Sequence, residues 1–209
     1  MSQQSDDSEC IITDNKTRFP LLEIKKIGTI TLWPITKIQF EMYISETNQY
    51  GDFWYDEILK CNPRVSFHQI TKKNYEQTFV TGIHVDEALS FAKWFGADFR
   101  IPTIEEWREI YQWLSTQSVI TPPTDMSYSA ERIWKKLMKV STSPIKFSLM
   151  QDGVVDWVKQ GTGYVGVGAP REKFYPAAWN PLTDTIKKIN HNERLKYLGF
   201  RLIQGDEHD

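Results

Sequence analysis

The spacing of apolar and polar residues predicts a first helix that begins just after Thr36. Thr36 and Gln39 stand three residues apart, as the two partners of a capping box do. Ile35 and Phe40 occupy the two positions of a hydrophobic staple around them. Apolar residues then recur at a spacing of four, which is typical of a buried helix face. We therefore expect a capped helix that packs one side against a core.

Two further helices are predicted in the middle of the chain. The segment 85–95 gathers its apolar residues on one face and places Asp86 and Glu87 at its start, where the helix dipole favours acidic groups. The next helix begins with a second capping box, formed by Thr103 and Glu106. The residues predicted to face the core are Val85, Ala88, Leu89, Ala92 and Phe95 in the first of these helices and Trp107, Ile110, Tyr111 and Leu114 in the second.

Short strands and irregular stretches account for most of the remaining chain. Residues 21–32 alternate loosely and are rich in β-forming residues, which indicates one or two strands. The aromatic-rich segment 47–80 has no clear period. The other predicted elements are a helix over about 131–140 and strands at 146–150, 154–158 and 198–203.

We predict one domain with two polar ends. Residues 1–18 are rich in Ser, Asp, Gln and Asn, which indicates a flexible N-terminal arm. Residues 205–209 form a short acidic tail. The segment 19–204 between them contains no linker and no internal repeat, and its length is sufficient to bury a core.

Composition and charge exclude several classes of protein. The net charge is −2 and no basic block occurs, which argues against a protein that binds duplex nucleic acid. No apolar run approaches the roughly 18 residues that span a bilayer, and the acidic N-terminus does not resemble a signal peptide. Cys10 and Cys61 are the two cysteines, and we interpret them as free thiols in the cytoplasm.

The stretch Gly161-Thr-Gly-Tyr-Val-Gly166 satisfies the pattern G-x-G-x-x-G. A dinucleotide loop with this pattern follows a strand and opens a helix, whose N-terminus holds the pyrophosphate. Here the pattern is followed by further glycines and by Pro170, so no helix is expected. We therefore predict a glycine-rich turn or strand pair, and no nucleotide site.

The histidines and acidic residues give weak indications of a metal site. None of the four histidines has the spacing of a helical metal pair, and none lies near a cysteine. Asp152 and Asp156 flank Gly153 and offer oxygen ligands to a cation, although solvated turn carboxylates explain them better. We accordingly expect no metal ion and no other cofactor.

The loop-rich C-terminal third carries a group of large side chains that is typical of protein-binding surfaces. Aromatic rings give contact area at low entropic cost, and arginine adds directed hydrogen bonds. For each ring taken singly, burial in a core built from loops is an equally good explanation. The residues predicted to contact a protein partner are Trp157, Tyr164, Arg171, Tyr175 and Trp179.

Four blocks of the sequence resemble, in order, those of the formylglycine-generating enzyme family, also called sulfatase-modifying factors. The largest is VTGIHVDEALSFAKWFGADFRIPTIEEWREI at 80–110. The others are WPITKIQFEMYI at 33–44, GVVDW at 153–157 and YLGFRLI at 197–203. The resemblance implies a C-type-lectin-like α+β domain with much irregular structure.

The same resemblance reveals two departures that bear on activity. Enzymes of this family use a pair of cysteines in the C-terminal region to bind copper and activate oxygen, and no cysteine follows Cys61 in this chain. The segment 153–157 departs from the block in which family members build a calcium site. We therefore expect a non-catalytic, protein-binding member, for example an accessory subunit in bacterial signalling or phage defence. The alternative is a metal-dependent oxidase of altered chemistry that uses Asp and His.

Overall fold

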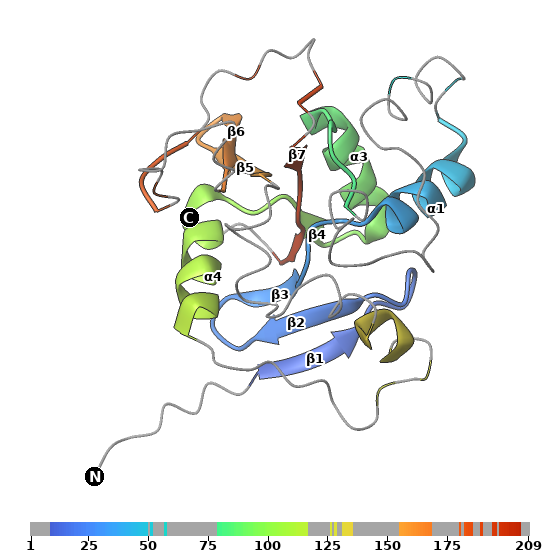
Figure 1. Cartoon of the computed structure of the whole chain (residues 1–209), viewed down its shortest axis with the longest axis horizontal. Helices are drawn as coiled ribbons and strands as arrows, with labels where there is room; N and C mark the ends of the chain where they lie inside the picture. Colours follow the sequence, from blue (N-terminus) through green and yellow to red (C-terminus); the bar gives the residue numbers. More distant parts are fainter. Residues whose placement is uncertain are drawn as a thin grey trace.

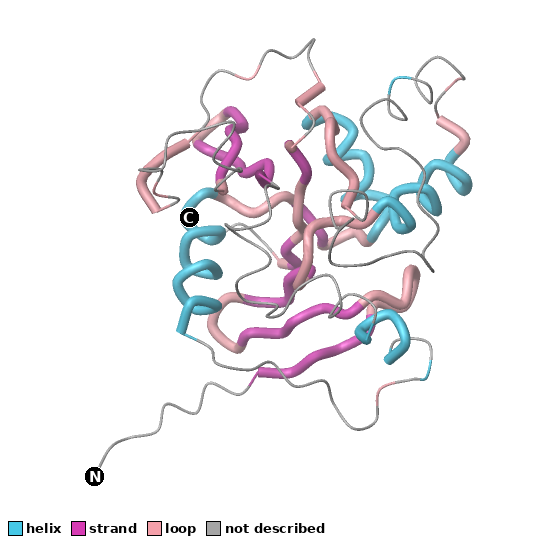
Figure 2. Tube along the Cα trace, viewed as in Figure 1, coloured by secondary structure: helices cyan, strands magenta, loops and turns pink. Residues whose placement is uncertain are grey.

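The structure is a computed structural model that describes most of the chain. The described residues are 9–49, 79–116, 131–135, 155–168 and 197–205, with short pieces at 51, 57, 126, 128, 180, 182–185, 189 and 194–195. Within them, two small β-sheets and the helices beside them form the α+β arrangement that the sequence predicts (Figures 1 and 2). None of the described helices is long and apolar enough to cross a membrane.

The larger sheet contains five strands in the order β1-β2-β3-β8-β4. These strands are β1 (Glu9–Thr13), β2 (Pro20–Ile24), β3 (Gly28–Thr31), β8 (Ile203–Gln204) and β4 (Phe99–Arg100). Every neighbouring pair is antiparallel. The predicted segment 21–32 thus forms two strands, in which Leu22 and Ile30 are cross-strand partners and both are buried.

Strand β1 shows that the prediction of a flexible arm over residues 1–18 is wrong from residue 9 onwards. The strand pairs with β2 along its whole length, beginning with Glu9 opposite Ile24. Ile11 is 4% exposed and belongs to the core. Polar composition concealed this strand because its stability comes from pairing with a distant segment, and local composition does not report such pairing. Residues 1–8 lie outside the described part of the chain.

The smaller sheet has the order β6-β5-β7. Its strands are β5 (Val155–Gln160), β6 (Gly163–Val167) and β7 (Leu198–Gly199). β5 is antiparallel to β6 and parallel to β7. The predicted strand at 198–203 is therefore two strands in different sheets, and the chain passes from one sheet to the other through the buried residues Phe200, Arg201 and Leu202.

Helix α1 (Lys37–Thr47) begins at the predicted capping box. The Gln39 N–H donates to Thr36 Oγ1 at 3.3 Å, and the Thr36 N–H donates to Gln39 Oε1 at 3.0 Å. Ile35 and Phe40, the predicted staple, are both buried. Helix α3 (Val85–Phe95) has the bounds that apolar spacing predicts.

An aromatic cluster joins α1, α3 and the link between the sheets. Phe40 stacks on Phe91 with centroids 5.6 Å apart, and Tyr43 meets Phe91 edge-on at 5.5 Å. Phe200 packs against Phe91 at 5.4 Å. Tyr43 and Phe91 were absent from the predicted helix faces, yet both are fully buried, because each helix is covered over a wider arc than its most regular apolar stripe.

Helix α4 (Ile104–Thr116) covers one end of the larger sheet (Figure 1). Its buried residues include Trp107, Ile110 and Leu114 of the predicted face, whereas Tyr111 is half-buried. Residues 131–135 are helical, in line with the predicted fourth helix, and Trp134 there meets Trp33 edge-on with centroids 5.3 Å apart. The rest of the predicted helix lies outside the described residues.

Candidate functional site

A buried ion pair at the centre of the molecule joins both sheets to α4. Arg201 Nε donates to Asp156 Oδ2 at 2.8 Å, and Trp107 Nε1 donates to the same oxygen at 3.1 Å. Arg201 Nη1 also donates to the carbonyl of Leu32 at 2.6 Å. Burial raises the pKa of the Asp156 carboxyl, and the charge of Arg201 opposes this shift. Asp156 is 1% exposed and Arg201 is 3% exposed, so solvent does not reach the pair. The pair therefore contributes to the stability of the fold.

Asp156 therefore differs from both sequence interpretations. It is not a solvated turn carboxylate, because it lies in β5 and is buried. Its Oδ2 atom, a potential cation ligand, already accepts hydrogen bonds from two donors, one of them cationic. Asp152, the other predicted ligand, lies outside the described residues.

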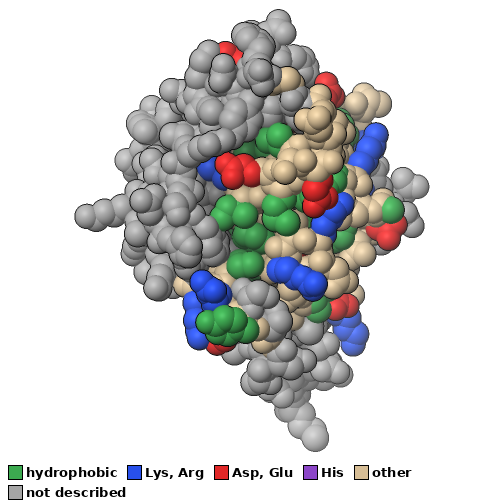
Figure 3. Space-filling view, turned by 90° about the vertical axis from the view of Figure 1, so that its right-hand side faces the viewer, with side chains coloured by type: hydrophobic (Ala, Val, Ile, Leu, Met, Phe, Trp, Pro, Cys, Tyr) green, Lys and Arg blue, Asp and Glu red, His purple; other side chains and the backbone are tan. Residues whose placement is uncertain are grey.

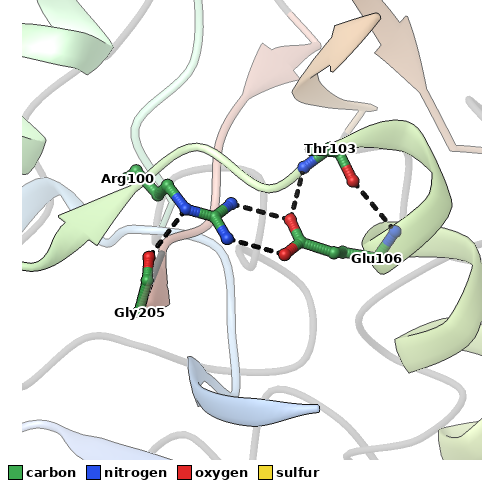
Figure 4. A network of polar contacts seen from close by, with 4 residues as sticks. All are labelled: Arg100, Thr103, Glu106 and Gly205. Atoms are coloured by element: carbon green, nitrogen blue, oxygen red, sulfur yellow. Dashed lines mark hydrogen bonds and ion pairs between the residues drawn. The ribbon is translucent and has the colours of Figure 1, made fainter. Parts of the chain in front are cut away.

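A second network fixes the start of α4 (Figure 4). Arg100 binds the Glu106 carboxylate through both terminal nitrogens at 2.7 and 2.6 Å, and its Nε donates to the carbonyl of Gly205 at 2.8 Å. The Thr103 N–H donates to Glu106 Oε2 at 2.8 Å, and the Glu106 N–H donates to Thr103 Oγ1. These two hydrogen bonds form the predicted capping box. Burial raises the pKa of Glu106, but the bonds from Arg100 and Thr103 outweigh it and the net pKa is lowered.

A third ion pair, the second of the three that is bidentate, fixes the start of α3. Arg194 donates to both oxygens of Glu87 at 2.7 and 2.5 Å and to the carbonyl of Gly82 at 2.7 Å. Glu87 also accepts the backbone N–H of His84, the N-cap residue of α3, at 2.8 Å. The other histidines, at 68, 191 and 208, lie outside the described residues.

These networks draw on three of the four sequence blocks. The segment 80–110 supplies Trp107 together with the Arg100–Glu106 pair, 153–157 supplies Asp156, and 197–203 supplies Arg201. Sequence reasoning recognised the blocks but not the ion pairs, since the partners are separated by 45 residues in one case and 107 in another. What the blocks build in this chain is a set of buried contacts that holds the helices and both sheets together.

The predicted partner-binding residues divide into three groups. Trp157 is 2% exposed, and its Nε1 donates to the carbonyl of Ile83 at 2.7 Å, so its ring belongs to the core and offers no contact surface. Tyr164, on β6, is half-buried and keeps part of its side chain at the surface. Arg171, Tyr175 and Trp179 lie outside the described residues.

The glycine-rich stretch forms the β5–β6 hairpin, in agreement with the predicted strand pair. Gln160 is opposite Gly163, so Gly161 and Thr162 make a two-residue turn. Gly161 has φ of 58°, as the first position of a type II′ turn requires. Because the stretch opens no helix, it lacks the helix N-terminus on which a dinucleotide loop depends.

The face on which α1 lies has a mixed character (Figure 3). Apolar side chains of described residues reach the surface near its middle, with Lys, Arg, Asp and Glu side chains of both signs around them. The described residues on this face form no continuous basic surface.

The cysteines do not fit the copper site that the family resemblance implies. Such a site needs two thiolates in the C-terminal region, and thiolate is the soft ligand that copper selects. Cys10 lies in β1, with Glu23 as its partner on β2, and Cys61 lies outside the described residues. From Asn62 to the end of the chain there is no cysteine, so β5 to β8 and the loops between them supply no thiolate.

Residues 14–110 match the family model of the sulfatase-modifying factor enzyme 1-like domain. The match covers slightly less than half of the chain, from the loop after β1 to the middle of α4. This part of the chain is thus similar to the formylglycine-generating enzyme, or sulfatase-modifying factor, family. No curated protein matches the sequence.

Proposed function

We propose that this protein is a non-catalytic member of its family, a protein-binding module that acts as an accessory subunit and presents loops from a C-type-lectin-like scaffold. The observation that carries the proposal is the absence of any cysteine after Cys61 in a chain that retains the family's sequence blocks. Side chains of those blocks, among them Asp156 and Arg201, hold the fold together. Such a chain keeps the scaffold without the thiolates that the family's oxidation needs.

The β5–β6 hairpin supports the proposed place of contact with a partner. Its tip, residues 160–163, is exposed, whereas Val155 to Val158 at its base are buried. Trp157 fixes that base by its hydrogen bond to Ile83. The hairpin therefore presents Tyr164 from a rigid support, and a rigid aromatic side chain loses little conformational entropy on binding.

The partner is expected to contact residues within about 157–180. Single replacements Tyr164→Ala, Arg171→Ala and Trp179→Ala are each expected to weaken binding by roughly thirtyfold, which is the ~2 kcal/mol of a typical hot spot. The matched control is Tyr128→Ala, because Tyr128 is 74% exposed and lies far along the chain from the hairpin. The partner is first recovered from the native organism with the full chain, and the affinities are then measured with the purified pair.

Folding of each variant is checked by circular dichroism before binding is measured. If all three folded variants bind the partner as tightly as the parent and Tyr128→Ala do, the proposed contact region is wrong. If no protein recovered from the native organism binds the folded, purified chain, the proposed function itself is wrong.

A further inference from the structure

A groove lies between the β2–β3 turn and the C-terminal half of α4. Its volume is about 320 Å³, and it is lined by residues 24–27 on one side and by Glu109, Gln112, Trp113 and Thr116 on the other. Figures 1 and 2 place this end of α4 beside the β2–β3 turn, and the β5–β6 hairpin near the opposite end of the helix. The groove is therefore separate from the β5–β6 hairpin.

The turn holds two lysines at the rim of the groove in a fixed shape. The Ile27 N–H donates to the Ile24 carbonyl at 2.9 Å, so Lys25 and Lys26 occupy the central positions of a hydrogen-bonded turn, and both are exposed. Gly28 follows with φ of 110°, and a Cβ added there would lie 3.1 Å from the Gln204 carbonyl oxygen. This close approach to β8 restricts the turn to its observed conformation.

Among the described residues that line it, the rest of the groove is apolar at its base, and Glu109 is its acidic side chain. Ile24 and Ile27 are 3% and 7% exposed and belong to the core, against which the half-buried Trp113 packs. Glu109 lies on the exposed side of α4. Lys25, Lys26 and Glu109 thus line the groove around an apolar base, and lysines beside an apolar surface complement a peptide that carries carboxylates beside one apolar side chain.

We propose that this groove binds a short acidic segment of a partner protein, with an apolar side chain on Trp113 and carboxylates on Lys25 and Lys26. The volume suits one or two side chains, in the manner of a peptide anchor. The inference rests on the proposed function only in requiring a protein partner, and it names a second surface and the chemistry that this surface recognises.

The test uses a defined peptide, fluorescein-Asp-Glu-Leu-Asp-Glu, and its uncharged counterpart fluorescein-Asn-Gln-Leu-Asn-Gln. Fluorescence anisotropy is measured with the full chain at about 50 mM salt, where charge attraction is little screened. We expect the acidic peptide to bind at least about tenfold more tightly than the uncharged one. The double variant Lys25→Glu/Lys26→Glu is expected to abolish that difference, and Trp113→Ala to weaken binding of both peptides.

The matched control is Lys93→Glu/Lys135→Glu, which makes the same change in net charge at exposed lysines on other helices. It is expected to change peptide affinity less than about twofold, since these lysines do not line the groove and exposed charges are screened by salt. Equal binding of the two peptides, or equal losses in the groove and control variants, would overturn the proposal. Failure here leaves the hairpin experiment unaffected, because the peptide test uses no partner and no variant of residues 157–180.

Two other occupants are distinguished in the same assay. Residues 1–8, which contain Asp6 and Asp7, join β1 at Glu9 opposite Ile24. If the acidic peptide binds only a variant that lacks residues 2–8, the chain's own N-terminus is the occupant and the partner assignment is wrong. If a single-stranded thymidine octanucleotide competes as effectively as unlabelled acidic peptide, the groove binds any anion. That result also overturns the assignment of a partner protein as the occupant.

Discussion

Replacement of Asp156 by alanine is expected to lower the free energy of unfolding by about 3–5 kcal/mol. The change leaves the guanidinium of Arg201 buried without its counter-charge and removes the acceptor of Trp107 Nε1. An unpaired buried charge costs far more than an exposed ion pair contributes. Urea unfolding followed by circular dichroism measures the loss.

Two controls separate the buried charge from general damage. The double variant Asp156→Leu/Arg201→Met removes both charges and is expected to recover most of the stability, because apolar residues of similar size replace a buried pair well. Glu131→Ala breaks the exposed Lys135–Glu131 pair and is expected to cost no more than about 0.5 kcal/mol. Similar losses for Asp156→Ala and Glu131→Ala would show that the central pair does not hold the fold.

Trp107→Ala is expected to destabilise the protein by about 3–5 kcal/mol. The ring is 1% exposed, stacks on Tyr111 with centroids 5.7 Å apart, and ties α4 to Asp156. Removal of the ring leaves a cavity between α4 and the sheets and also deprives Asp156 of a donor. The measurement is again urea unfolding.

Two milder replacements at the start of α4 provide a scale for this loss of stability. Thr103→Ala removes the side-chain half of the capping box and is expected to cost about 1 kcal/mol. Trp107→Phe keeps an apolar ring but drops the indole N–H, so its cost is expected to lie between the other two. A neutral Trp107→Ala would mean that the inner face of α4 is assigned to the wrong residues.

The helices were predictable because their signals are local. Thr36 with Gln39 and Thr103 with Glu106 lie three residues apart, and the observed bonds close both capping boxes as the spacing predicts. The bounds of α3 follow from apolar periodicity in the same way. Wherever the decisive contact lies within one helical turn, the sequence is sufficient.

The strand β5 was predicted at 154–158, but its burial and the buried charges were not predictable on these terms. Residues 155–158 are all buried, so β5 is covered on both faces and Asp156 and Trp157 lie in the core together. An aspartate in a predicted turn and a tryptophan beside a glycine-rich loop suggest surface positions. Their burial is decided by β7 and Arg201, which lie more than 40 residues further along the chain. The same non-local pairing explains why β1 was mistaken for part of a flexible arm.

We propose, as the central point, that this chain keeps the fold of the formylglycine-generating enzyme family without the oxidation that the family carries out. The most direct test is incubation of the purified protein with a Cys-x-Pro-x-Arg peptide, copper and oxygen, followed by mass spectrometry of the peptide for the aldehyde of formylglycine. Because no cysteine follows Cys61, we predict no aldehyde above a protein-free blank, while an active family enzyme converts the same peptide in parallel. Aldehyde that forms faster than in the blank, and that disappears when the protein is heat-denatured beforehand, would contradict the claim.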